Sequence, residues 1–165
     1  MEYLDEPGPH GFFSRLARVG LLLEAFQARC FDPFGLRFID YSVLRMLELE
    51  GDLSPSRLAD LVVRSSGGMT QILDRLERAG LVARRPDPSD RRKVMVGLTP
   101  QGLRLVRRAN RAWVAQKQEL LAGVGDAEFT RVDRAVEELL QRLDEHLDRE
   151  PAAARRAVPT GVAAT

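Results

Sequence analysis

The sequence predicts a mainly α-helical fold that carries one small β-hairpin. Most of the chain repeats apolar residues at steps of three and four, which is the period of an amphipathic helix. One segment differs, because residues 94–98 alternate apolar and other side chains as a half-buried strand does. The apolar run 81–83 precedes it, and Pro86 to Ser89 between them favour a turn.

Length and composition predict one soluble globular domain over residues 1–165, with 44% hydrophobic and 30% charged residues. No segment approaches the ~20 apolar residues of a membrane span, and the first residues lack the pattern of a secretory signal. We therefore expect a cytoplasmic protein. A single cysteine, Cys30, and two distant histidines, His10 and His146, predict neither a disulfide nor a metal site, and no motif indicates a cofactor.

The net charge of +1 is unevenly distributed along the chain. From Arg64 to Arg108, eleven basic residues stand against four acidic ones, and the remainder of the chain is acidic. A concentrated positive charge of this kind favours a polyanionic partner such as nucleic acid. A solvated basic helix face is the alternative.

The first two helices are expected over residues 11–31 and 38–50. The cluster from Asp32 to Gly35 ends the first, and Gly51 ends the second. The two ends of the chain, residues 1–9 and 150–165, lack sustained periodicity and are expected to be mobile tails.

Two further helices follow. Ser54 and Pro55 give a side-chain cap followed by a residue with a helical φ, which begins a third helix. After a turn at Arg64, a fourth helix is expected over 66–79, ended by Gly80. With the hairpin behind it, this arrangement is a winged helix-turn-helix, expected over residues 38–102.

The last two helices resemble dimerisation elements. Thr99 and Pro100 repeat the cap-then-proline start, and Asp126 is expected to cap a final helix whose apolar residues follow a near-heptad pattern. We expect residues 11–31 and 103–147 to form a homodimer, because both present long apolar stripes outside the reading module. Packing of these helices onto their own chain is the alternative.

A helix that enters the major groove must present polar groups near its N-terminus. The recognition-helix candidates that meet this requirement, or could read guanine, are Ser65, Ser66, Gly67, Thr70, Gln71 and Arg75. Adjacent glycines at the start of this helix allow either a close approach to DNA or a weakly formed first turn. Asp74 is expected to pair with Arg78 one turn later.

The hairpin tip supplies a second set of candidates, namely Asp90, Arg91 and Arg92. An arginine in the minor groove is attracted by the negative potential there, and a neighbouring carboxylate can orient its guanidinium. In the alternative, Asp90 caps the turn while Arg92 stays solvated. Phosphate contacts are expected from Ser54, Arg64 and Arg84.

Several of these runs resemble the multiple antibiotic resistance regulator (MarR) family of bacterial transcription factors. The resemblance lies in Ser54 to Ala59, in Met69 to Val82, and above all in Asp87 to Arg92 leading to Leu98 to Gly102. It implies a triangular homodimer whose winged modules bind a palindromic double-stranded promoter site, with Arg92 entering the minor groove and Asp90 orienting it. It also implies a repressor released by a small aromatic acid or phenol. The types such an effector pocket needs occur at Phe12, Arg15, Phe38 and Tyr41.

Other functions remain as alternatives at this point. Some members of the family sense oxidants, which would require a reactive Cys30, although a buried inert thiol is the interpretation we favour. An activator or an architectural DNA binder is also compatible with the residues. Catalytic motifs are not recognisable, so an enzyme is not expected. Trp113 is expected to pack in the dimer core.

Overall fold

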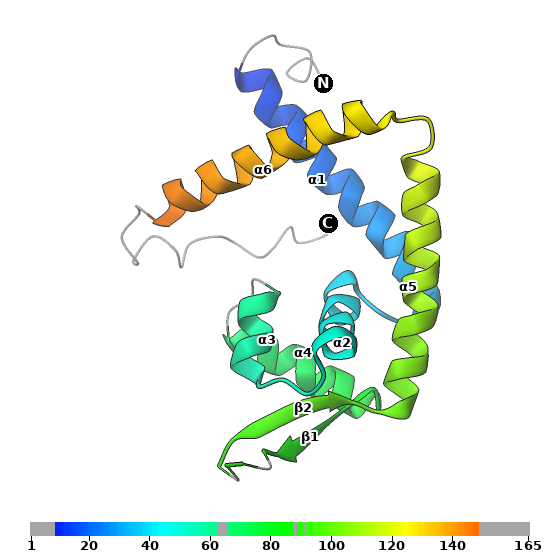
Figure 1. Cartoon of the computed structure of the whole chain (residues 1–165), viewed down its shortest axis with the longest axis vertical. Coiled ribbons are helices and arrows are strands. Elements are labelled where there is room, and N and C mark those ends of the chain that lie inside the picture. The colour runs from blue at the N-terminus through cyan, green and yellow to red at the C-terminus, as the bar shows by residue number, and fades with distance from the viewer. Residues whose placement is uncertain (1–8, 63–65, 88, 91, 149–165) are drawn as a thin grey trace, which may run out of the picture. The chain divides into compact units, whose positions relative to one another are not determined.

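The computed structural model describes residues 9–62, 66–87, 89–90 and 92–148, and is mainly helical (Figure 1). Contacts divide the chain into two units, residues 1–120 and 121–165. The elements of the first unit are α1 (Pro9–Phe31), the short 3-10 helix η2 (Asp32–Phe34), α2 (Phe38–Glu50), α3 (Pro55–Leu61), α4 (Ser66–Arg78), β1 (Val82–Pro86), β2 (Val94–Leu98) and α5 (Pro100–Leu120). The second unit contains α6 (Asp126–Asp148).

The two cap-then-proline starts are confirmed. The Ser54 hydroxyl accepts the backbone N–H of Arg57 at 3.2 Å and begins α3. The Thr99 hydroxyl accepts the N–H of Gly102 at 3.0 Å and begins α5. Gly80 ends α4 with a φ of 69°, a left-handed conformation that glycine adopts without steric cost.

The α5 start also packs closely on the chain that leads into β1. A Cβ built on Gly102 would lie 2.0 Å from the backbone oxygen of Leu81. The Leu81 oxygen accepts the N–H of Thr99 at 3.0 Å, so the two segments are held together by a backbone hydrogen bond. Glycine is therefore required at position 102 for this close approach.

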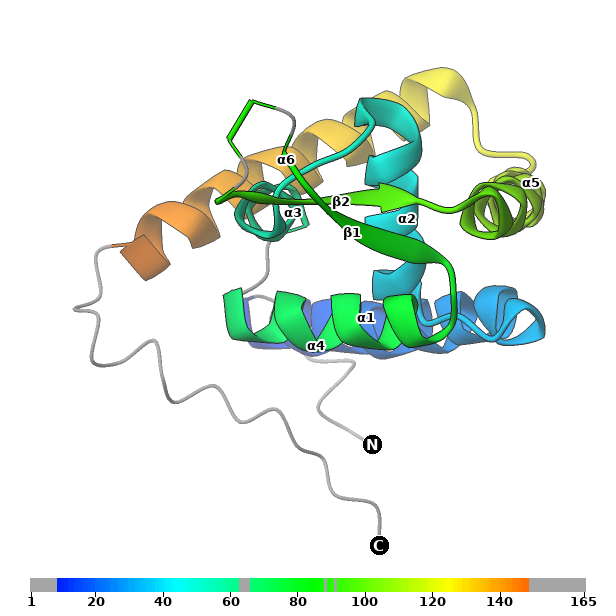
Figure 2. The same cartoon turned by 90° about the horizontal axis from the view of Figure 1, so that it is seen from below.

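The hairpin forms as expected. β1 and β2 are antiparallel, with Val82 opposite Leu98 and Pro86 opposite Val94. Leu53 extends the sheet beside β2 by a single antiparallel β-bridge, because it exchanges two backbone hydrogen bonds with Val96, at 2.8 and 3.0 Å. Figure 2 shows the hairpin, with β1 packed against α4 and β2 against α2 and α3. The wing is thus attached to the helix-turn-helix along both strands.

The core lies between the C-terminal end of α1, α2, α5 and the helix-turn-helix. Its largest fully buried side chains are Phe31, Val43, Leu44, Leu58, Met69, Leu73, Val96 and Val106. The lone tryptophan, Trp113 of α5, packs within this chain against Phe26, Phe31 and Phe38, with ring centroids 5.4 to 5.8 Å apart. Burial of these apolar and aromatic side chains stabilises the frame that carries the wing and α4.

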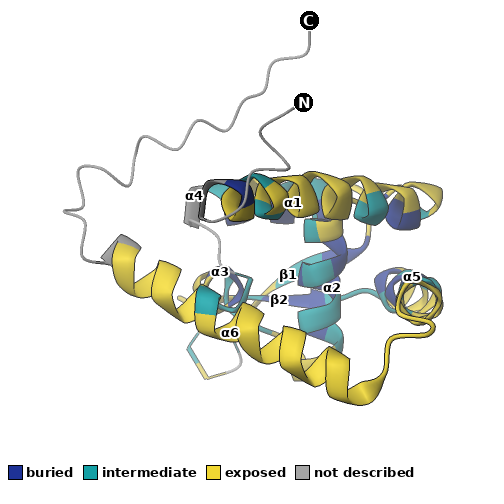
Figure 3. Cartoon of the chain, turned by 90° about the horizontal axis from the view of Figure 1, so that it is seen from above, coloured by how far each residue is buried: buried dark blue, intermediate teal, exposed yellow. Residues whose placement is uncertain are grey.

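Figure 3 shows that much of α1 and the described part of α6 are exposed. Large apolar side chains are among the exposed residues of both helices, from Phe12 to Leu23 on α1 and from Phe129 to Leu143 on α6. The exposed apolar residues of α6 are Phe129, Val132, Val136, Leu140 and Leu143, which keep the near-heptad spacing expected from the sequence. Asp126 is the first residue of α6 in the structure, and the backbone oxygen of Gly125 accepts the N–H groups of Glu128 and Phe129.

Candidate nucleic-acid interface

The helix α4 presents one polar face and one buried face. Met69, Leu73 and Leu76 are buried, whereas Thr70 and Gln71 on the first two turns are exposed. Of the other recognition-helix candidates, Ser66 and Gly67 begin α4, and Ser65 lies outside the described residues. The exposed polar groups sit at the N-terminal half of the helix, where its dipole is positive and favours an anion.

Arg75, the remaining candidate on α4, is held by a partner within the chain. Its guanidinium forms an ion pair with Asp40 of α2, a residue that is only 3% exposed. The same carboxylate accepts the backbone N–H of Arg37 at 3.0 Å and so caps the start of α2. Arg75 therefore connects the recognition helix to α2, and part of its hydrogen-bonding capacity is used in that contact.

Arg84 of β1 also binds carboxylates. Its guanidinium donates to Asp74 at 2.6 Å and to Glu77, both on α4, and its backbone N–H donates to Glu77 at 3.2 Å. The Asp74 hydrogen bond, with the nearby Glu77 charge, raises the pKa of Arg84.

The expected pairing of Asp74 with Arg78 is wrong for the carboxylate. The Nε of Arg78 donates to the backbone oxygen of Asp74 instead, at 3.1 Å. The carboxylate of Asp74 is taken by Arg84, a partner that enters from the neighbouring strand. Helical spacing alone does not show that partner.

The turn at the wing tip is built on Asp87. Its carboxylate accepts the N–H groups of Ser89 and Asp90 and the hydroxyl of Ser89, and these bonds lower the pKa of Asp87. Backbone hydrogen bonds from Asp87 to Lys93 and from Lys93 to Asp90 close the turn.

Within this turn the Asp90 carboxylate accepts the backbone N–H of Arg92 at 3.1 Å and lies 3.9 Å from the ammonium of Lys93. Asp90 thus caps the turn, as in the alternative considered from the sequence. Arg92 is exposed, and Arg91 lies outside the described residues.

Of the two remaining candidates for phosphate contact, the structure describes Ser54 but not Arg64. Ser54 lies at the N-cap of α3 with its hydroxyl also 3.1 Å from that of Ser56. Arg64 lies outside the described residues.

Beside the helix-turn-helix lies a cavity of about 370 Å³. Its lining comes from α2 and the end of α3, and comprises Phe38, Ile39, Tyr41, Ser42, Arg45, Met46, Leu61 and Val62. The Tyr41 hydroxyl donates to Asn110 of α5 at 2.7 Å, and burial raises its pKa. A mainly apolar cavity of this size with a few polar groups suits a small organic ligand.

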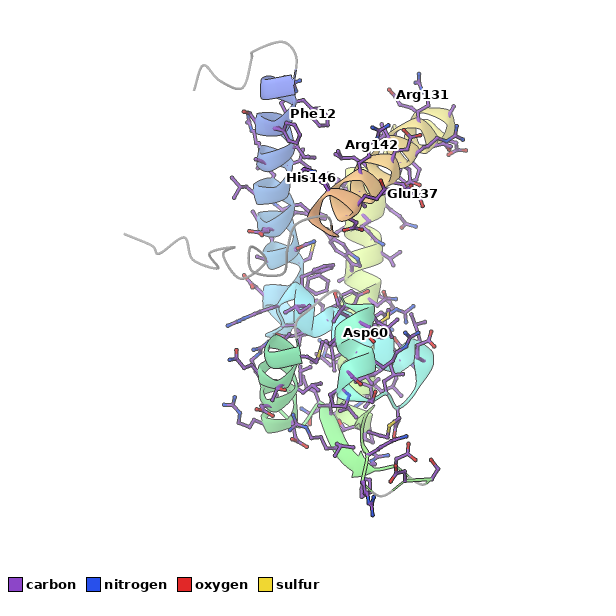
Figure 4. The ribbon with its side chains drawn as sticks, turned by 90° about the vertical axis from the view of Figure 1, so that its left-hand side faces the viewer. Phe12, Asp60, Arg131, Glu137, Arg142 and His146 are labelled. Atoms are coloured by element: carbon purple, nitrogen blue, oxygen red, sulfur yellow. The ribbon has the colours of Figure 1, made fainter. Side chains whose placement is uncertain are left out.

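The four residues proposed for an effector pocket are only partly brought together. Phe38 and Tyr41 line the cavity, whereas Phe12 and Arg15 belong to the N-terminal half of α1 and are not among its lining residues. Figure 4 shows Phe12 on α1, where its ring packs edge to face on Phe13 at 5.5 Å.

Sequence reasoning missed Arg45, which supplies a cation to the cavity lining. Arg45 donates to Glu48 of the same helix at 2.6 Å, and Arg107 of α5 donates to the same carboxylate at 3.0 Å, which links α2 to α5. Arg45 lies four residues after Tyr41 on α2, and that helical spacing was the available signal.

Cys30 is buried, as the sequence interpretation favoured, at 6% exposure. Burial raises the pKa of its thiol and outweighs the opposing charge of Arg29. Because the thiolate is the reactive species, the local environment lowers its reactivity. Among the described residues, no group of three His, Cys, Asp or Glu side chains could hold a metal ion.

The comparisons with known proteins agree with this geometry. The family model described as "MarR family" matches residues 40–94. The HTH-type transcriptional regulator PecS of Dickeya dadantii is 32% identical over 135 residues, covering 80% of this chain and 79% of the relative. The HTH-type transcriptional repressor Rv2887 of Mycobacterium tuberculosis is 31% identical over 136 residues, covering 82% and 96%.

Solved structures share the fold. A mutant of E. coli MarR complexed with operator DNA aligns with a TM-score of 0.72 at 22% identity, covering 79% of this chain and 94% of that one. CouR from Rhodococcus jostii RHA1, bound to p-coumaroyl-CoA, aligns with a TM-score of 0.66 at 27% identity, covering 75% and 87%.

No helix in the described parts of the chain is long and apolar enough to cross a membrane. The matched relatives are named as transcriptional regulators and not as enzymes. The expectation of a winged helix-turn-helix fold with a two-stranded wing is confirmed. With a curated relative above 30% identity over most of both chains, this chain belongs to the MarR family of transcriptional regulators.

Proposed function

We propose that the protein is a homodimeric, sequence-specific DNA-binding regulator that represses a promoter until a small aromatic or phenolic ligand releases it. The observation that carries the proposal is that the exposed Thr70 and Gln71 of α4 and the basic wing are held on one frame. A helix and a hairpin fixed together can read two adjacent grooves of one duplex.

In this proposal the first turns of α4 enter the major groove. Thr70 and Gln71 meet base edges, and Gln71 can form a paired contact with adenine. The phosphate backbone of the DNA is approached by Ser65, Ser66 and Gly67, at the positive end of the helix dipole. A contact of Arg75 with guanine would require its guanidinium to leave the ion pair with Asp40. We therefore assign base reading to Thr70 and Gln71.

The wing supplies the minor-groove contact. Arg92 is exposed at the tip, and the negative potential of a narrow minor groove attracts its guanidinium. Asp90, which caps the turn through the N–H of Arg92, fixes the backbone from which that side chain extends. Arg91, Arg64 and Ser54 are assigned to phosphates.

Dimerisation explains the exposed apolar side chains of α1 and α6. Side chains such as Leu22, Leu23 and Val132 are between 44% and 59% exposed in the single chain. A second copy would remove them from water, and the resulting two-fold symmetry matches a palindromic site with half-sites about 34 Å apart.

The ligand is assigned to the cavity beside α2. Phe38 and Tyr41 supply aromatic surface, and Arg45 takes the role of the cation that the sequence assigned to Arg15. The structural relative CouR is bound to p-coumaroyl-CoA, an aromatic acid thioester, which supports an aromatic ligand class for this chain.

Fluorescence anisotropy tests the DNA reading directly. The full-length protein is titrated onto the duplex upstream of its own gene and onto a scrambled duplex, at two salt concentrations. Arg92→Ala is expected to weaken specific binding by about 1 to 3 kcal/mol. The matched control is Arg131→Ala on α6 (Figure 4), which removes the same charge outside the module.

Each outcome decides the proposal. Tight binding to the native duplex alone, weakened by Arg92→Ala and not by Arg131→Ala, supports a sequence-specific regulator. Equal binding to both duplexes with a steep salt dependence would leave only the phosphate contribution and would favour an architectural DNA binder. Salicylate is the first ligand to add, with Arg45→Ala as the variant expected to lose its effect. A promoter reporter then separates repressor from activator.

A further inference from the structure

We propose that Arg84 is a positioning residue that fixes the angle between the wing and the recognition helix, and that this angle sets the affinity for specific DNA. The inference rests on the proposed function, since it assumes that α4 and the wing bind one duplex together. It gives Arg84 a different role from the phosphate contact expected from the sequence.

Arg84 contacts two successive turns of α4. Its guanidinium donates to Asp74 and Glu77, and its own backbone N–H donates to Glu77. We call these three residues the Arg84 network. A planar guanidinium that binds two carboxylates in different directions fixes orientation as well as distance, which a single ion pair does not.

The network lies at the end of a continuous connection across the wing. Arg84 is opposite Val96 in the hairpin, and Val96 exchanges two backbone hydrogen bonds with Leu53. Leu53 directly precedes the cap of α3. One row of the sheet therefore joins the start of α3, both strands of the wing and α4.

Charge balance argues against Arg84 as a phosphate contact. Its single positive charge already faces two carboxylates, so the Arg84 network as a whole carries a net negative charge. A network with a net negative charge does not attract DNA phosphates, so a contribution of the Arg84 network to DNA binding must come from something other than its charge. A contribution through geometry is consistent with the contacts, because holding two reading elements in their bound arrangement lowers the entropic cost of binding.

The network is expected to contribute little to global stability. The three side chains are between 30% and 47% exposed, and ion pairs at that exposure contribute little net free energy. The attachment of the wing base depends instead on the buried side chains of Leu81 and Val82. Loss of the network should therefore change DNA affinity much more than melting temperature.

The test uses a variant for which the two roles of Arg84 predict opposite changes in the affinity for specific DNA. Asp74→Asn with Glu77→Gln makes the full-length protein more positive by two charges. If Arg84 binds phosphate, freeing it raises affinity for DNA. If Arg84 positions the wing, specific affinity falls, by about tenfold, while binding to scrambled duplex does not fall.

The matched control adds the same two charges elsewhere in the first unit. Glu50→Gln and Asp60→Asn neutralise two exposed carboxylates outside the Arg84 network, and Figure 4 shows Asp60 on α3. This control is expected to bind specific DNA at least as tightly as the wild type. Arg84→Lys is the conservative variant, since it keeps the charge and loses the planar fork, and it is expected to lose specific affinity as well.

A second measurement reports on the wing without DNA. Spin labels at Gln71→Cys and Val94→Cys, in a Cys30→Ala background, give the distribution of distances between α4 and the wing. We expect a narrow distribution in the wild type, and a broader one when Asp74→Asn and Glu77→Gln are present, with an unchanged melting temperature.

The outcomes separate the two proposals. Unchanged or tighter specific binding by the Asp74→Asn, Glu77→Gln variant would overturn the positioning role, as would an unchanged label distribution. A wild-type protein that binds neither duplex would overturn the proposed function instead, and the label distances would then still decide whether Arg84 fixes the wing.

Discussion

Arg75 of the recognition helix and Asp40 of α2 lie 35 positions apart and form an ion pair around a buried carboxylate. Asp40 also accepts the N–H of Arg37, so one side chain both begins α2 and anchors α4. The Nε of Arg75 is buried without a hydrogen-bond partner among the described residues. The partly buried guanidinium of Arg75 therefore depends on Asp40 to offset the loss of its hydration.

Replacing Asp40 should destabilise the first unit strongly. Asp40→Ala leaves a guanidinium without its anion and removes the cap of α2, so we expect the free energy of unfolding to fall by about 3 kcal/mol. Urea unfolding followed by circular dichroism measures this. Glu50→Ala, at an exposed position of the same helix, should stay within about 0.5 kcal/mol of wild type. Equal effects of the two variants would contradict a structural role for the pair.

Glu48 should make stability depend on pH in the acidic range. Burial alone would raise its pKa, but hydrogen bonds from Arg107 and Arg45 outweigh burial and lower the pKa below the usual 4.5. The unfolded chain then binds the proton more readily, so the stabilisation is complete above pH 4.5 and is lost as the pH falls through the folded-state pKa. The stability difference between wild type and Glu48→Gln should shrink over that interval. A constant difference from pH 6 to pH 3 would refute this.

Gly102→Ala should strain the junction between the wing and α5. The new Cβ would meet the backbone oxygen of Leu81 at 2.0 Å, and a backbone atom cannot move aside as a flexible side chain does. We expect a loss of about 1 to 3 kcal/mol in thermal or urea unfolding. Gly125→Ala is the control, because its Cβ would meet nothing within 4 Å. A neutral Gly102→Ala would show that this contact relaxes without cost.

Cys30 should react slowly in the folded protein. The thiol is buried and its pKa is raised, so both access and thiolate content are low. Ellman's reagent is expected to react much faster in urea than in native buffer, and Cys30→Ala should bind DNA as the wild type does before and after peroxide. Release of the wild type alone by peroxide would favour the oxidant-sensing alternative.

The apolar row of α6 should be needed for self-association. Val136→Lys in the full-length chain puts a charge among the exposed apolar side chains, and we expect a monomer by light scattering at concentrations where the wild type is a dimer. Truncation before residue 126 should give the same result. Glu137→Lys, one position away on the polar face, should remain dimeric. A dimeric Val136→Lys would place the interface elsewhere.

Local signals in the sequence predicted the helices and the wing well. Ser54 with Pro55, and Thr99 with Pro100, each begin a helix because a hydroxyl cap and a fixed φ act within a few residues. The turn over Asp87 and Ser89 was predicted for the same reason. Such features need no knowledge of the rest of the fold.

The partners of charged side chains were not predictable in the same way. Asp74 was assigned to Arg78 by helical spacing, yet its carboxylate binds Arg84 from β1, and Arg75 binds Asp40 from another helix. Phe12 and Arg15 were grouped with Phe38 and Tyr41 by residue type, and only the latter two line the cavity. In each case the contact depends on how elements pack, which periodicity does not report.

The packing of Trp113 gives the protein an optical reporter of its own. It is the single tryptophan of the chain, and its ring lies 5.8 Å from Phe38, which lines the cavity, and 5.4 Å from the ammonium of Lys117. A molecule that enters the cavity and moves Phe38 changes the surroundings of the indole. Intrinsic fluorescence of the unlabelled protein can therefore be used to screen chemical libraries for occupants of the cavity, before any promoter sequence is known.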